Sequence, residues 1–132
     1  MNNVLNPTTY LLRLGFFPQH YGFGYLVQAI SAVAANPKGY YSRSVDIFEV
    51  LKRDFGVQRP KASRCMHYSI ATAWQAPNNE ELRRLFPTCQ ANYPPAVTEF
   101  VCRIAIGLSE YNQGGFADAS SDISDARMPA LN

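Results

Sequence analysis

The chain has 132 residues, 47% of them apolar and 13% aromatic, which fits one folded domain with a single core. The net charge is +2, and the lack of an apolar run long enough to cross a bilayer, together with an N-terminus without a signal-peptide pattern, favours a cytoplasmic protein with no membrane segment. Three widely spaced cysteines without a C-x-x-C pair argue against disulfides or a zinc site, and we expect no cofactor.

Segments with apolar residues at helical spacing follow one another along the chain, so the predicted fold is all-helical. Asn6 can cap the first segment, with Pro7 in its first turn. The second repeats apolar residues at three and four positions between Phe23 and Ala34. The predicted helices span about residues 7–14, 21–35, 43–55, 60–75, 79–86 and 95–111.

The third and fourth predicted helices are separated by a very short link. Ser42 is a plausible cap for the third helix, Gly56 ends it, and Pro60 opens the fourth. A short link that starts with glycine is typical of a helix-turn-helix and also of a plain helical hairpin. The sequence therefore predicts a compact helical pair over about residues 43–75, with both interpretations open.

The last third of the chain begins with a short helix and ends in a polar tail. Asn78 or Asn79 can cap the short helix, and Pro95 opens the last one. Residues 113–132 are small, polar and faintly acidic, which predicts a disordered tail after a domain of residues 1–112.

The fourth predicted helix has an apolar face and an opposite polar face. Apolar residues from Ala62 to Ala73 fall on one side, and no acidic residue occurs between Phe55 and Asn79. In a helix-turn-helix the start of the second helix contacts base edges, although any surface helix can show such a stripe. The candidate DNA-binding residues are Arg43, Arg59, Lys61, Ser63, Arg64, His67 and Tyr68.

Four blocks stand in order along the chain: LG-x6-GFGYLVQAI in residues 14–30, ATAW ending at Trp74, NNEELRRLF, and PAVTEF in residues 95–100. Together they resemble the C-terminal effector domain of the sporulation response regulator, the stage-zero sporulation protein A family. The resemblance covers about residues 11–111. It implies a six-helix domain that binds promoter DNA in the major groove, often as two copies on tandem sites.

The resemblance also implies where this domain would meet DNA and its protein partner. The family reads guanines with arginines at three successive exposed turns, and these turns carry Lys61, Arg64 and His67 here. The family's contact with the sigma subunit of RNA polymerase matches about residues 78–88. In this chain that surface holds Glu80, Glu81, Arg83 and Arg84. A phosphorylated receiver domain precedes the family's effector domain, and we expect this chain to act without one.

His20, Gly22, Gly24 and Trp74 are further candidates for a site. His20 lacks a nearby acidic partner, so we expect a packed loop histidine rather than a catalytic base, and no enzyme activity. Gly22 and Gly24 are expected to permit close helix packing, and Trp74 to anchor the core. The leading hypothesis is a sequence-specific transcriptional regulator. The alternative is a helical protein-interaction module or antagonist that kept the fold and lost specific DNA reading.

Overall fold

The structure, a computed structural model, describes residues 6–36, 38, 46–77, 79–89 and 93–110. Within these ranges the regular elements are all helices, which confirms the predicted fold class. They are α1 (Pro7–Arg13), α2 (Tyr21–Ala35), α4 (Ile47–Phe55), α5 (Arg59–Gln75), α6 (Glu80–Arg84) and α7 (Val97–Glu110). None of the described helices is long and apolar enough to span a membrane.

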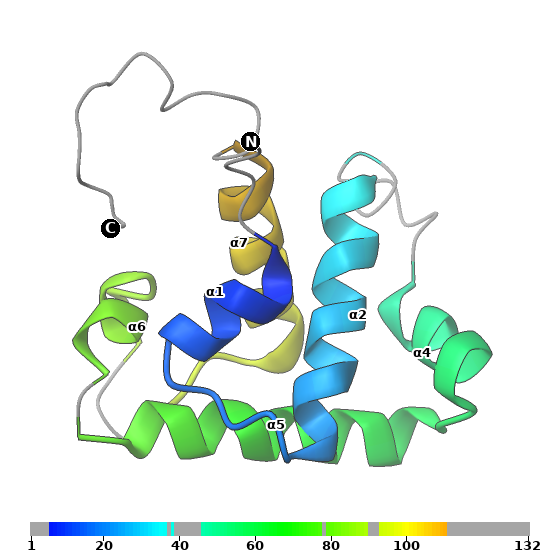
Figure 1. The fold of residues 1–132 in the computed structure, drawn as a ribbon, viewed down its shortest axis with the longest axis horizontal. Coiled ribbons are helices and arrows are strands. Elements are labelled where there is room, and N and C mark those ends of the chain that lie inside the picture. The colour runs from blue at the N-terminus through cyan, green and yellow to red at the C-terminus, as the bar shows by residue number, and fades with distance from the viewer. Residues whose placement is uncertain (1–5, 37, 39–45, 78, 90–92, 111–132) are drawn as a thin grey trace.

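Helix α2 is the central element of the fold. It packs against α1, α4, α5 and α7, and its predicted apolar face is buried, with Leu26, Ile30 and Val33 fully inaccessible. Towards α4 it is held by a 2.6 Å hydrogen bond from Gln28 Nε2 to Asp54 Oδ2. In Figure 1, α5 lies along the lower edge of the molecule, with α2 and α7 standing above it. One face of α5 is therefore left without a covering helix.

A row of aromatic rings joins the far end of α5 to α7. The ring of Trp74 lies edge-on to Phe86 at a centroid distance of 6.4 Å, and Phe86 stacks on Phe100 at 5.7 Å. All three side chains are at most 1% exposed. Trp74 is thus a core residue, as the sequence indicated, because burying so large a ring removes a wide apolar surface from water.

The link between α4 and α5 is short because Gly56 reverses the chain in the left-handed region, at φ 68°. Its N–H donates to the Lys52 carbonyl at 2.9 Å, which closes the last turn of α4. Val57 inserts into the core, and α5 begins after Gln58. Across the link the Arg59 guanidinium lies over the Phe48 ring, 4.2 Å from its centroid.

Some of the predicted helix ends differ from the observed ones, most of all the start of α4. Asp46 is extended and accepts a 2.9 Å hydrogen bond from the Phe48 N–H, so α4 begins at Ile47 rather than at residue 43. An aspartate at this position satisfies an otherwise free N–H, which is why the helix starts there. Residues 43–45 and the predicted cap Ser42 lie outside the described residues.

Both ends of α2, the start of α1 and the last residues of α4 and α5 are as predicted, and the remaining ends shift by one or two residues. Asn6 caps α1 as expected, accepting from the Thr9 N–H at 2.8 Å, but the helix ends at Arg13. α5 begins one residue before Pro60, while α6 and α7 are shorter than predicted. The predicted tail of residues 113–132 lies outside the described residues and remains a prediction.

Candidate nucleic-acid interface

Helix α5 exposes a polar face along the edge of the molecule. Lys61, Arg64, His67 and Tyr68 are exposed, and Ser63 is half-buried. On the opposite side, Ala62, Met66, Ile70 and Ala73 are at most 1% exposed. This is the separation that the helical period predicts, with the exception of Cys65, which is only half-buried.

Close contact between helices holds α5 in this position. The backbone of α2 at Gly22 approaches α5 so closely that a Cβ there would lie 2.1 Å from the Cys65 carbonyl oxygen and 2.9 Å from Ser69 Oγ. Gly22 therefore permits close packing, as expected. The same expectation for Gly24 is wrong, because a Cβ at Gly24 would meet nothing within 4 Å.

The exposed face of α5 is basic, and no described carboxylate neutralises it. Arg59 and Lys61 contact aromatic rings, those of Phe48 at 4.2 Å and Tyr21 at 5.8 Å. The ion pair found among the described residues joins Arg53 to Asp54, which are both on α4 and not on α5. The positive charges of α5 therefore remain available to an anion such as a phosphate group.

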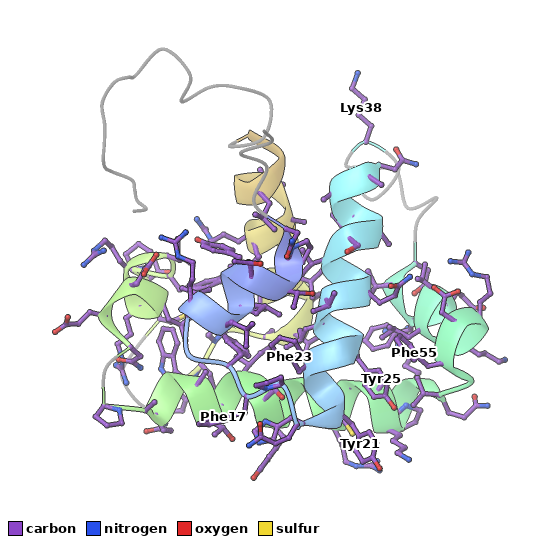
Figure 2. All side chains as sticks on the ribbon, viewed as in Figure 1. Phe17, Tyr21, Phe23, Tyr25, Lys38 and Phe55 are labelled. Carbon is purple, nitrogen blue, oxygen red and sulfur yellow. The ribbon has the colours of Figure 1, made fainter. Side chains whose placement is uncertain are left out.

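Aromatic side chains border this basic face where the loop between α1 and α2 meets α5. Figure 2 shows Phe17 and Tyr21 beside α5, at the start of α2. The His20 ring lies 5.0 Å from the Tyr68 ring and 5.4 Å from the Phe17 ring, measured between centroids. His20 Nδ1 is 3.1 Å from Ser69 Oγ, within hydrogen-bond distance. His20 is thus a packed loop histidine.

A surface pocket of about 310 Å³ opens between these aromatic side chains and α5. Tyr21, Gly22, Arg64 and Tyr68 are among its lining residues, so it adjoins the central arginine of the exposed face. Tyr68 was predicted from the sequence to lie at this surface, whereas Phe17 and Tyr21 were not. The aromatic run FFPQHYGFGY was visible, but nothing local in it indicates which helix it would pack against.

The second candidate surface, on α6, lies near the other end of α5. Glu80 and Arg84 are exposed there, whereas Glu81 and Arg83 are half-buried. Arg83 donates to the Trp74 carbonyl at 2.9 Å and its guanidinium lies 4.9 Å from the Trp74 ring centroid. Arg83 therefore makes its contacts within the domain, with the end of α5. Arg43, the remaining candidate for DNA contact, lies outside the described residues.

The cysteines are dispersed free thiols. Cys65, Cys89 and Cys102 are each half-buried, and burial raises the pKa of the Cys89 and Cys102 thiols. Within the described part of the chain, no group of three histidine, cysteine or acidic side chains is arranged to hold a metal ion.

The described part of the chain forms a small all-helical domain with an exposed basic helix. The family model described as Sporulation initiation factor Spo0A C terminal matches residues 8–108. The chain therefore belongs to this family, the DNA-binding effector domain of a sporulation regulator. A comparison with curated proteins gives no match.

Proposed function

We propose that this chain is a sequence-specific transcriptional regulator that places α5 in the major groove of duplex DNA, with α4 and α5 as a helix-turn-helix. The observation that carries the proposal is the exposed face of α5, which has Lys61, Arg64 and His67 on successive turns and no described carboxylate paired with its cations. Major-groove edges of guanine offer two acceptors that such side chains can contact.

Arg64 is the base-reading residue in this proposal. It is exposed at the centre of the polar face, about 60° around the helix from Lys61 and from His67. Its planar guanidinium can donate two hydrogen bonds to one guanine, whereas lysine acts as a point charge. Arg59 and Lys61 would mainly contact phosphates, which positions the helix without reading sequence.

The family further suggests two copies on tandem sites and a contact with the sigma subunit, and we include both in the proposal. Glu80 and Arg84 are the α6 side chains exposed enough for such a contact. Ser63, half-buried on α5, is a candidate for a contact with the DNA backbone. A protein-interaction module is the competing function, because exposed tyrosines such as Tyr68 also suit a protein partner.

The test begins with selection of bound sites from random duplex DNA. Wild type, Arg64→Ala and Arg103→Ala are then titrated on the selected duplex and on a scrambled one. Arg64→Ala should lose about 1–3 kcal/mol on the selected duplex and much less on the scrambled duplex.

Arg103→Ala is the matched control, since it removes the same charge from an exposed position on α7. It should bind the selected duplex like wild type, and circular dichroism should show all three proteins to be folded. If no motif is enriched, or if Arg64→Ala binds the selected duplex like wild type, the protein-interaction module becomes the better function.

A further inference from the structure

We propose that the pocket beside Arg64 accepts the C5-methyl group of a thymine, so that the site read by this protein contains a specific thymine near the guanine contacted by Arg64. This inference rests on the proposed function and adds the chemistry of a second base. The observation behind it is that aromatic side chains border the exposed basic face of α5. Contacts of the basic residues with phosphates or guanine give no reason for these rings.

Two of these rings are strongly exposed: Tyr21 is 76% and Tyr68 is 61% accessible. Large apolar surface in water is unfavourable, so a pair of open rings on one functional face indicates a contact made on binding. A phosphate group would be a poor occupant of the space between them, because ring faces carry negative charge density. The thymine methyl is the apolar group that the major groove presents.

The pocket is held in shape by contacts beneath it. The Tyr68 ring packs on His20, and His20 is placed by Ser69 Oγ at 3.1 Å and by the edge of Phe17. Gly22 forms part of the pocket lining where α2 meets α5. A pocket organised before binding loses little side-chain entropy when a methyl group enters, so even one methyl can add measurable affinity.

The charges around the pocket favour duplex DNA as the occupant over an apolar peptide. Arg64 lines the pocket itself, and the Lys61 ammonium lies 5.8 Å from the centroid of the Tyr21 ring. A methyl group attached to a base comes with phosphates on either side, which these cations would meet. The arrangement therefore matches an apolar group carried on a polyanion.

The position of the thymine follows from the helix. Tyr68 lies one turn after Arg64, about 6 Å further along the α5 axis, so the bases that the two residues reach should lie no more than roughly two base-pair steps of 3.4 Å apart. The thymine is therefore expected within two base pairs of the guanine. His20 is a positioning residue in this arrangement, since it acts through the Tyr68 ring.

The experiment replaces each thymine of the selected duplex by uracil, one at a time, which removes only the methyl group. Uracil at one position, within two base pairs of the guanine, should weaken binding roughly fourfold, the equivalent of about 0.8 kcal/mol for one buried methyl. Uracil elsewhere should have little effect. In Tyr68→Ala, uracil at this position should no longer weaken binding. In Tyr68→Phe, which keeps the ring, uracil should weaken binding as it does in wild type.

The outcomes separate this inference from the proposed function. Failure of wild type to bind any selected duplex refutes the proposed function itself. Specific binding in which every uracil duplex equals its thymine parent overturns the methyl contact and leaves the proposed function standing. Binding of the single strand as tightly as the duplex would also overturn it, because the rings would then stack on bases.

Discussion

At the residue scale, Gly22 and Gly24, both in α2, differ in whether the packing leaves room for a Cβ atom. Gly22 sits where the α2 backbone meets the Cys65 carbonyl, while Gly24, two residues on, has open space at its Cβ position. Both are glycines inside a helix and look alike in the sequence. Their roles differ because helical residues two positions apart point about 200° apart, so only one of them faces α5.

Gly22→Ala should lower the free energy of unfolding by about 1–3 kcal/mol, because its new methyl group would overlap the α5 backbone, which cannot rotate away. Gly24→Ala should raise the free energy of unfolding by about 0.5–1 kcal/mol, because alanine lowers the entropy cost of an unobstructed helix position. Urea unfolding followed by circular dichroism measures both. Equal effects of the two substitutions would contradict the close approach of α2 to α5.

Tyr10 gives a second prediction at this scale. Burial, and then the negative charge of Glu81, raise the pKa of the Tyr10 phenol from 10.0 to about 12. Because the folded pKa lies above the unfolded one, the neutral phenol stabilises the fold fully below about pH 10, and this contribution is lost as the pH rises towards about 12. Stability should fall over that interval.

The measurement is the absorbance of ionised tyrosine during an alkaline titration of wild type and Tyr10→Phe. The difference between the two curves should contain one phenol that titrates near pH 12 in the folded protein. In urea the same phenol should titrate near its ordinary value of about 10. A difference curve centred near pH 10 without urea would show that Tyr10 is solvated.

At the scale of elements, the end of α5 is held by residues that follow it. Asn79 is buried and its side-chain amide donates to the Trp74 carbonyl, while Asn79 Oδ1 accepts from Arg83 Nε at 3.1 Å. Arg83 donates to the same carbonyl at 2.9 Å. Carbonyls at the end of a helix lack partners within it, so these contacts replace the missing hydrogen bonds. They also fix α6 against α5.

Arg83→Ala should therefore lower the free energy of unfolding by about 1.5–3 kcal/mol, the range for hydrogen bonds to charged groups. Arg84→Ala, which removes a neighbouring exposed arginine, should change it by less than about 0.5 kcal/mol. Thermal unfolding of the two variants side by side provides the comparison. If Arg83→Ala unfolds like wild type but loses a protein partner, Arg83 belongs to the partner surface and not to the cap.

At the scale of the whole molecule, the net charge of +2 hides an uneven distribution. Helix α5 carries Arg59, Lys61 and Arg64 without an acidic residue, and it lies along one edge of the molecule (Figure 1). The positive charge of this helix therefore lies on the face of α5 that we propose contacts DNA. Attraction of this kind is screened by salt.

DNA affinity should fall steeply as salt rises. The charges of Arg59, Lys61 and Arg64 together would displace the counterions of about three phosphates, which gives a slope of about −2.7 for the logarithm of affinity against the logarithm of salt concentration. This means a loss of roughly 40-fold between about 50 and 200 mM salt. Lys61→Ala should flatten the slope by about 1, and Arg103→Ala should leave it unchanged. Affinity that does not depend on salt would instead indicate a protein partner.

Helical periodicity was sufficient to predict the described helices and the buried faces of α2 and α5. Apolar side chains at three- and four-residue spacing must leave water together, so their pattern carries that information locally. Helix starts were less well predicted, as α4 shows. Asp46 and Ser42 are both good caps by residue type, so the local sequence does not decide between them.

The sequence alone determined that this chain is helical, that α5 has one apolar and one basic face, and that Arg64 lies at the centre of the basic face. Only the tertiary structure decided that Phe17, Tyr21 and His20 border that face, and that Arg83 caps a helix whereas its neighbour Arg84 is exposed. The physical reason is that helix faces follow from spacing along the chain. The neighbours of a connecting loop follow from how separate helices pack, which no local pattern encodes.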